Sequence, residues 1–344
     1  MTIDRQHWEG RAARPEDPLW IVVLAGGQGR RLATFVRNIL GDTRPKQFCR
    51  ILGHRSMLRH TWERAGRLVP AARVVTVITA GQERFLAAEA QERGVPGRVL
   101  VQPVDRDTGP GVLLPLLWIA YRQPDACVAV FPADHFVWEE SRFLGHVAEA
   151  VSTSRRRPDR IVLLGMEPDG PETSYGWIEA GVPCAGGLPD RELFAVANFY
   201  EKPPDALAAR LHAAGGLWNS FVMAGTVSAF LQLVRRTHPD ALGLLQSAAS
   251  RFGTSAEREA IAGAYRRLPA FNFSRDVLAA EQDTLLVHPA RRLTWSDWGE
   301  PARILDTVVR IGRRPSWLAN EAHHRPGQRQ SASLETRSAR RVRG

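Results

Sequence analysis

Short apolar runs alternate with longer polar or amphipathic stretches along most of the chain. Runs rich in Val, Ile and Leu are typical of strands buried on both faces of a sheet. They cover residues 21–24, 74–79, 99–101, 126–131, 161–165, 196–200 and 285–287. The stretches between them predict helices over residues 51–68, 82–93, 112–122, 224–249 (with a break near Pro239) and 303–310. Because strands and helices alternate, we expect an α/β fold, with a Rossmann-like mixed, mainly parallel sheet flanked by helices.

The same pattern divides the chain into three parts. Residues 1–18 carry no apolar periodicity and predict a flexible lead-in, whereas residues 19–320 predict a single domain. Residues 321–344 hold six arginines and two glutamates. Such a composition cannot bury a core, so we expect a disordered basic tail.

Composition and charge narrow the classes of function. With 344 residues, 44% of them hydrophobic, the chain can bury a sizeable core. Its formal net charge is +10, and the tail contributes +4 of this. The remaining excess is modest for an enzyme with polyanionic substrates. A nucleic-acid-binding protein would need a basic face interleaved with aromatic residues, or a known module, and the sequence shows neither.

The pattern also argues against a membrane protein and against a disulfide-rich secreted protein. No apolar run approaches the roughly 20 residues needed to span a bilayer, and the polar N-terminus lacks the apolar segment of a secretory signal. Cys49, Cys127 and Cys184 are widely spaced, which indicates free thiols rather than a disulfide framework or a zinc site. We therefore expect a cytoplasmic protein with no membrane partner.

The strongest candidate chemistry follows the first apolar strand. Residues 25–29 (AGGQG) hold three glycines, which let backbone N–H groups converge and let a bulky ligand approach the main chain. Arg31 and, after a connector, Lys46 come close behind. Such a turn is a place to hold phosphates. It is neither a Walker loop nor a dinucleotide fingerprint, because no Lys-Ser or Lys-Thr follows and position 32 is not glycine.

Two further segments carry candidate ligand contacts. Residues 102–111 combine Gln102 with small residues, so the main chain there could lie against a flat base, or could simply form a turn. Asp134 follows the strand at 126–131, at the end where α/β proteins bind ligands. The same residue could instead cap a helix.

In combination these segments resemble the sugar-nucleotide pyrophosphorylase (nucleotidyltransferase) family, and especially its mannose-1-phosphate guanylyltransferase branch. The glycine turn with the arginine matches G-G-x-G-x-R-L, and residues 45–48 (PKQF) follow it. Residues 102–111, 175–179 (YGWIE), 201–203 (EKP) and 217–221 (LWNSF) match later family segments in the family's order. The resemblance covers residues 20–312. Departures are a longer connector over residues 32–44 and Arg30 where many relatives have Thr.

The resemblance implies transfer of GMP from GTP to mannose 1-phosphate, giving GDP-mannose and pyrophosphate, with Mg²⁺ as cofactor. It implies catalytic roles for Arg31, Lys46 and Asp134, and metal binding by Asp134 and Asp297. The implied nucleotide-binding residues are Leu24, Ala25, Gly26, Gly27, Gly29, Arg30, Gln102, Thr108 and Gly109. The implied sugar-phosphate-binding residues are Gly176, Glu179, Glu201, Lys202 and Asn219.

Several alternatives stay open at this point. Another sugar 1-phosphate or another nucleotide would fit the same pattern, because epimers differ by the direction of one hydroxyl. A regulatory protein could keep the nucleotide pocket and lose turnover, although the presence of Arg31, Lys46, Asp134 and Asp297 argues against it. A NAD-binding dehydrogenase lacks support, because the third glycine and the downstream acidic residue are missing. The oligomeric state is open, a homo-oligomer included.

Overall fold

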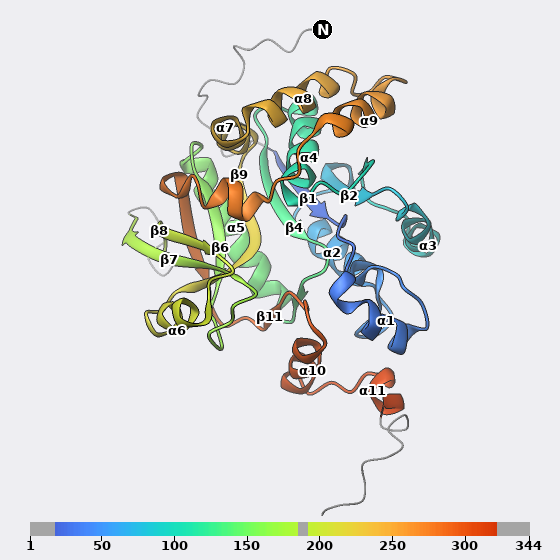
Figure 1. Ribbon diagram of the computed structural model, residues 1–344, viewed down its shortest axis with the longest axis vertical. Helices are drawn as coiled ribbons and strands as arrows, with labels where there is room; N and C mark the ends of the chain where they lie inside the picture. The colour runs from blue at the N-terminus through green and yellow to red at the C-terminus, as the bar shows by residue number, and fades with distance from the viewer. Residues whose placement is uncertain (1–17, 185–191, 322–344) are drawn as a thin grey trace, which may run out of the picture.

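The computed structural model describes residues 18–184 and 192–321, and the side chains of these residues up to 318. Residues 1–17 of the predicted lead-in, residues 185–191 and residues 322–344 of the predicted tail lie outside the described residues. The described part is one α/β domain built on a nine-stranded sheet, in the order β3-β2-β1-β4-β9-β6-β10-β8-β7 (Figure 1).

The two halves of this sheet differ in strand direction. In the first half β1 (Leu19–Leu24), β2 (Val74–Thr79), β3 (Arg98–Gln102) and β4 (Cys127–Pro132) are all parallel. The second half contains β6 (Ile161–Met166), β7 (Gly176–Pro183), β8 (Phe194–Glu201), β9 (Leu217–Thr226) and β10 (Leu285–Ala290). There β9 runs antiparallel to β4, β6 and β7, and β8 runs antiparallel to β7 and β10. The sheet is therefore mixed, and the expectation of a mainly parallel arrangement holds only for its first half.

Helices cover both faces of the sheet (Figure 1). One face packs against α4 (Thr108–Arg122), α7 (Val227–Thr237), α8 (Pro239–Ala249) and α9 (Glu257–Arg267). The other packs against α2 (Met57–Gly66), α5 (Glu140–Arg156) and α6 (Asp205–Ala213). A smaller apolar cluster joins α1 (Ala33–Leu40), α10 (Pro301–Arg310) and α11 (Ser316–Glu321). The polar helix α3 (Glu83–Arg93) lies at the edge of the sheet.

Several elements differ from those that the sequence predicts. The connector over residues 32–44 contains α1, and Phe35 of this helix packs edge-to-face against Trp317 of α11. The sequence did not predict β9, whose Asn219 and Ser220 break the apolar run although both are buried. The predicted helix over 224–249 therefore starts only after Thr226. Helix α9 was also not predicted. Tertiary contacts decide these elements, and a single-sequence pattern does not contain them.

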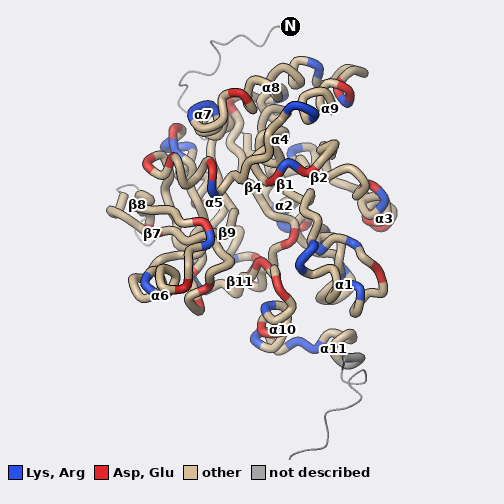
Figure 2. The backbone as a smooth tube through the Cα atoms, in the orientation of Figure 1, with Lys and Arg blue, Asp and Glu red and all other residues tan. Residues whose placement is uncertain are grey.

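The sheet brings the candidate residues to one edge. The carboxyl ends of parallel strands point the same way, so the segments that follow β1 and β4 meet there. A small second sheet pairs β5 (Phe136–Val137) with β11 (Trp295–Ser296) and so joins the segment after β4 to the C-terminal third. Basic and acidic positions are interspersed over the backbone in this view (Figure 2). Within the described residues, no helix is both long and apolar enough to cross a bilayer.

Candidate active site

A cavity of about 400 Å³ opens at the carboxyl ends of β1 and β4. It is lined by many of the side chains and glycines that the sequence singles out. These are Leu24, Gly26, Gly27, Arg31, Gln102, Thr108, Asp134, Gly176, Glu201, Lys202, Asn219 and Asp297. Segments separated by more than 250 positions thus share one cavity, and the glycine loop and the 176–219 group both line it.

The glycine loop is held in place through its carbonyl groups. Gln47 Nε2 donates to the carbonyl oxygens of Ala25 (2.5 Å) and Gly27 (2.9 Å). Gln82 Nε2 donates to those of Gly26 (3.1 Å) and Gly27 (3.0 Å). In a trans peptide the C=O and the following N–H point in opposite directions. The N–H groups of Gly26, Gly27 and Gln28 therefore point away from the two glutamines, and none of them donates a hydrogen bond among the described residues.

Gln102 lies against this loop with its amide orientation fixed. A Cβ at Gly26 would stand 2.8 Å from Gln102 Nε2, so only glycine allows this approach. The Oε1 atom accepts a hydrogen bond from the Tyr265 hydroxyl at 3.1 Å. Burial raises the pKa of Tyr265, so this hydroxyl keeps its proton and remains a donor. The Nε2 group of Gln102 is thereby turned towards the loop and presents a donor to a ligand.

Lys46 connects Asp134 and Asp297. Its Nζ lies 2.9 Å from Asp134 Oδ2 and also donates to the backbone carbonyl of Asp297. The lysine side chain is only 6% exposed. Burial by itself raises the pKa of both aspartates, but the charges of Lys46 and His135 outweigh it and hold both values below the usual range. Both carboxylates are therefore ionised at neutral pH.

One oxygen of Asp297 is fully engaged by the protein. Its Oδ1 accepts hydrogen bonds from the Tyr175 hydroxyl (2.9 Å), the Gly299 N–H (2.8 Å) and Arg303 Nη1 (2.9 Å). Arg303 also pairs with Glu172 (2.6 Å) and stacks on the Tyr175 ring at 4.1 Å. Among the described residues no hydrogen bond reaches Oδ2, the other oxygen of Asp297. The Asp297 carboxylate is thus held in one orientation, with Oδ2 left for a ligand.

The far end of the cavity is polar and closely packed. A Cβ at Gly176 would lie 2.9 Å from Glu201 Oε2 and 3.2 Å from the Asn219 side chain. Asn219 is held in turn, because its Oδ1 accepts from the Phe221 N–H at 3.0 Å. Burial raises the pKa of Glu201, and the nearby Lys202 ammonium at 3.6 Å offsets part of this effect. A half-buried carboxylate beside an amide is suited to binding sugar hydroxyls.

Five of the expected residues sit behind or beside the cavity rather than in its lining, namely Ala25, Gly29, Arg30, Lys46 and Gly109. Gly29 adopts φ +62°, and a Cβ there would approach the Lys46 amide nitrogen to 3.0 Å. A glycine at this position therefore leaves room for the backbone of Lys46. Gly109 belongs to α4, and its N–H donates to the carbonyl of Phe271 at 2.9 Å. Arg30 is exposed.

Glu179 does not belong to the cavity either. It accepts a hydrogen bond from Asn198 Nδ2 at 2.7 Å, across the β7–β8 pair. Successive side chains of a strand point to opposite faces. Glu179 lies three positions after Gly176, so it faces away from the side that Gly176 presents to Glu201. Of the two glutamates Glu179 and Glu201, only Glu201 lines this end of the cavity.

Several residues of the site were not singled out from the sequence. They include Gln47, Gln82, Glu172, Tyr175, Tyr265 and Arg303, which hold the residues that line the cavity. Of these residues, only Gln47 and Tyr175 could have been recognised in the sequence, because both lie inside segments that match the family. Three lining residues, Asp107, Lys202 and Phe221, also have positive φ without being glycine (67°, 51° and 57°). Such strained backbone gathers at functional sites and is not visible in the sequence.

Comparisons with known proteins agree with this geometry. The family model described as nucleotidyl transferase matches residues 21–312. The Xanthan biosynthesis protein XanB of Xanthomonas campestris pv. campestris (strain B100) is 30% identical over 308 residues, which are 88% of this chain and 61% of that protein. A mannose-1-phosphate guanylyltransferase of Escherichia coli is 32% identical over 230 residues, which are 66% of this chain and 47% of that protein.

Among solved structures, one described as mannose-1-phosphate geranyltransferase from Thermus thermophilus aligns with a TM-score of 0.67 at 29% identity. The alignment covers 82% of this chain and 76% of that one. The chain spans about half to three fifths of the length of the curated relatives named above. The family match nevertheless covers most of the described domain and both ends of its cavity, which confirms the resemblance found in the sequence. The chain therefore belongs to the nucleotidyl transferase family.

Proposed function

We propose that this protein transfers GMP from GTP to mannose 1-phosphate, giving GDP-mannose and pyrophosphate. The observation that carries the proposal is that Asp134 and Asp297, which Lys46 contacts from beside the cavity, line one cavity together with the glycine loop and Glu201. One end offers backbone N–H groups for phosphates, and the other offers Glu201 and Asn219 for hydroxyls. A cavity of this kind fits a nucleotide and a sugar phosphate that meet in the middle.

The orientation of Gln102 supports a guanine base over adenine or cytosine. With Oε1 occupied by Tyr265, the amide offers its Nε2 donor to the ligand. Guanine carries an acceptor at O6, whereas adenine and cytosine carry amino donors at the corresponding edge. Uracil and thymine also offer an acceptor there, and the names of the relatives favour guanine among the three.

Asp134 and Asp297 fit a magnesium ion. Mg²⁺ takes hard oxygen ligands and is commonly held by one or two carboxylates together with water and substrate phosphates. Among the described residues there is no cluster of three or more His, Cys, Asp or Glu side chains suited to a metal. Two carboxylates would therefore need water and substrate phosphates to complete the ligand set. Asp297 Oδ2 and the Asp134 carboxylate would hold the ion. When bound, it would neutralise charge on the phosphates.

The remaining chemistry consists of positioning and charge neutralisation. A phosphate monoester is largely dianionic near pH 7, since its second pKa is about 6, so the sugar phosphate can attack the α-phosphorus without a general base. Lys46 stabilises the charge on the reacting phosphates, and Arg31 and the loop N–H groups hold the leaving pyrophosphate. The two ends of the cavity keep both substrates in line, which removes much of the entropic barrier.

A substrate panel tests the proposal. Purified protein with Mg²⁺ is incubated with each of the common NTPs and a set of sugar 1-phosphates, and pyrophosphate release is measured. We expect the highest kcat/KM for GTP with mannose 1-phosphate. A higher value for another pair would reassign the substrates within the same reaction. Absence of pyrophosphate with every pair would refute a transferase and favour a sugar-nucleotide-binding protein.

A further inference from the structure

The segments that carry the two candidate metal-binding aspartates are joined to each other outside the cavity. Asp134 follows β4 and Asp297 follows β11, and the two segments pair through the small β5–β11 sheet. In addition, side chains at the start of α5 bind residues 292–294, which lead into β11. These side chains belong to Glu139 and Arg142, and neither lines the candidate active site. Any role that they have in the reaction is therefore indirect.

Thr294 is bound at its N–H, its hydroxyl and its carbonyl by two consecutive residues. Its N–H donates to Glu139 Oε2 at 2.7 Å, and its hydroxyl donates to Glu139 Oε1 at 3.2 Å. Its carbonyl oxygen accepts a hydrogen bond from the Trp138 N–H at 3.0 Å. Thr294 lies three residues before Asp297, and Glu139 lies five residues after Asp134. The approach to one aspartate is thus fixed against the segment that follows the other.

Glu139 occupies the N-cap position of α5, but its side chain does not cap this helix. An N-cap side chain usually accepts a hydrogen bond from an N–H group of the first turn, and Ser, Thr, Asp and Asn are preferred there. The carboxylate of Glu139 makes no such bond. Both of its oxygens bond Thr294 instead. The side chain at this position therefore serves the contact between the two segments and not the helix.

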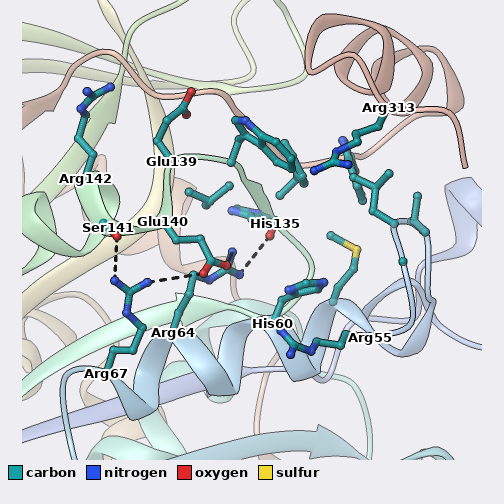
Figure 3. Close-up of a pocket in the computed structure, with 18 residues that line it drawn as sticks. Arg55, His60, Arg64, Arg67, His135, Glu139, Glu140, Ser141, Arg142 and Arg313 are labelled. Atoms are coloured by element: carbon teal, nitrogen blue, oxygen red, sulfur yellow. Dashed lines mark hydrogen bonds and ion pairs between the residues drawn. The ribbon is translucent and has the colours of Figure 1, made fainter.

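Arg142, one helical turn further along α5, binds the same segment. Its Nη1 donates to the carbonyl oxygen of Arg292 at 2.7 Å. Both Glu139 and Arg142 line a neighbouring cavity of about 840 Å³, and Figure 3 shows their side chains pointing the same way. Arg292 has φ +58°, a left-handed conformation that a residue other than glycine keeps only where its surroundings hold it. Residues 292–294 are therefore held at both ends by the start of α5.

A metal ion shared by two carboxylates makes their separation critical. Mg²⁺ demands a nearly ideal octahedron of ligands at about 2.0–2.1 Å, so neighbouring ligand oxygens stand about 2.9 Å apart. A misplacement of about 1 Å can lower a rate about 100-fold. Lys46 bridges Asp134 and Asp297 from beside the cavity. The contacts with α5 hold the same two segments at a second place.

We propose that Glu139 is a positioning residue, which sets the distance between the Asp134 and Asp297 carboxylates through its two hydrogen bonds to Thr294. Because Glu139 lies outside the cavity lining, it acts through the two aspartates. Its bonds fix the chain just before β11, so that Asp297 Oδ2 and the Asp134 carboxylate can hold one Mg²⁺ together. Mg²⁺ tolerates little distortion, so loosening this contact weakens metal binding. The role rests on the proposed function, since that function supplies the metal.

Two substitutions of Glu139 separate the contact from the mere presence of a polar side chain. Glu139→Ala removes both bonds to Thr294. Glu139→Gln keeps them, because the amide oxygen can accept from the Thr294 N–H while the amide nitrogen donates to the Thr294 hydroxyl. A matched control, Glu257→Ala, removes a glutamate that accepts a hydrogen bond from the Gly253 N–H at 2.9 Å, outside the cavity lining.

The first measurement is pyrophosphate release as a function of Mg²⁺ concentration, with the nucleotide and sugar phosphate that the wild type uses best. We expect Glu139→Ala to need about tenfold more Mg²⁺ for half activity and to lose about tenfold in kcat. Its KM for the sugar phosphate, measured at saturating Mg²⁺, should stay within about threefold of the wild type, because the sugar end of the cavity is unchanged. Glu139→Gln and the control should match the wild type.

The second measurement is amide hydrogen exchange over residues 291–299, without metal or substrate. Exchange reports local opening, so Glu139→Ala should exchange faster in this segment, and Glu139→Gln and the control should not. This result does not depend on turnover or on which substrates are accepted. Thr294→Val removes only the hydroxyl bond and should change both measurements in the same direction but less. It also replaces Glu139→Ala if the melting temperature shows that this variant is not folded.

The outcomes separate this role from the proposed function. Unchanged exchange in both Glu139→Ala and Thr294→Val would overturn the proposal whether or not the protein is a transferase. A lower kcat with an unchanged Mg²⁺ requirement would show that Glu139 is only structural, and would overturn it as well. A wild type that releases no pyrophosphate with any substrate pair, or releases it equally well without Mg²⁺, would refute the proposed function or its shared metal, and the positioning role with them.

Discussion

The two ends of the active-site cavity are built in different ways. At the phosphate end, backbone atoms of a glycine loop face the ligand, and the side chains of Gln47 and Gln82 hold that loop through its carbonyl groups. At the sugar end, side chains face the ligand, and Gly176 makes room for them. A main-chain site depends on local sequence, whereas a side-chain site depends on which strands pair. The first kind can be recognised in one segment, and the second only in the fold.

The largest effect is expected where the two ends meet. Lys46→Ala should lower kcat by about 100-fold or more, because a buried cation that stabilises charge in the transition state is lost. Lys46→Met, which keeps most of the apolar volume, should lose as much, so charge rather than packing would be responsible. Turnover of either variant within threefold of the wild type would place Lys46 outside the site. Circular dichroism checks that both are folded.

A smaller loss, of about 30-fold in kcat, is expected for Asp297→Asn, together with a higher Mg²⁺ concentration for half activity. We expect a similar loss in kcat and a similar increase in the Mg²⁺ requirement for Asp134→Asn. The double variant should be little worse than the poorer single one, because groups that act as a unit are not additive. Asp169→Asn, at an exposed ion-paired aspartate, is the control. An unchanged Mg²⁺ dependence in Asp297→Asn would contradict the shared metal.

Two glycine variants test directly whether the two ends of the cavity bind different substrates. Gly26→Ala places a methyl group 2.8 Å from Gln102 Nε2, and Gly176→Ala places one 2.9 Å from Glu201 Oε2. Gly26→Ala should raise KM for GTP by about tenfold, or about 1.4 kcal/mol, and leave KM for mannose 1-phosphate nearly unchanged. Gly176→Ala should do the reverse. If both variants raise both KM values equally, the two ends do not act separately.

The smallest effect concerns pH at the sugar end. Burial raises the pKa of Glu201, so its carboxylate becomes protonated at a higher pH than usual. If the ionised form binds sugar hydroxyls, KM for mannose 1-phosphate rises as the pH falls through this raised pKa. Glu201→Gln should raise KM by about fivefold at neutral pH and abolish that pH dependence.

Stability should change in the opposite sense in the same variant. A carboxyl whose pKa is raised by folding stabilises the fold below its unfolded-state pKa, and this contribution is lost as the pH rises through the folded-state value. At neutral pH the ionised Glu201 therefore costs stability. Glu201→Gln should melt at the same temperature as the wild type or at a higher one, as measured by calorimetry. A clear drop in melting temperature would show that the carboxylate is structural.

The difference between the two ends also explains what the sequence could predict. The glycines, Arg31 and Lys46 lie in one stretch with its own signature, and strand β1 before them is apolar throughout. Glu179 and Glu201 could not be told apart in the same way. Whether Glu179 faces the cavity depends on which face of β7 its side chain occupies. The register of β7 against β8 also shifts after Glu179, which the sequence does not show.

Supporting residues were hardest to predict. Tyr265 lies in α9, which the sequence did not reveal, and it reaches Gln102 across 163 positions. Arg303 was expected only as part of a closing helix, and its bond to Asp297 appears once α10 is in place. These roles arise from contacts between distant segments. No local pattern of apolar and polar residues encodes such contacts.

The two glutamines that hold the glycine loop have one further consequence. A free segment with three glycines has more conformational freedom than a segment without glycine, and ordering it on binding would oppose affinity. Gln47 and Gln82 bind its carbonyls before any ligand arrives, so that loss of entropy belongs to folding and not to recognition. The loop is thereby preorganised. Nucleotide affinity would then respond to replacement of Gln82, a residue that lies behind the loop and outside the cavity lining, as strongly as to replacement of a residue that contacts the phosphates.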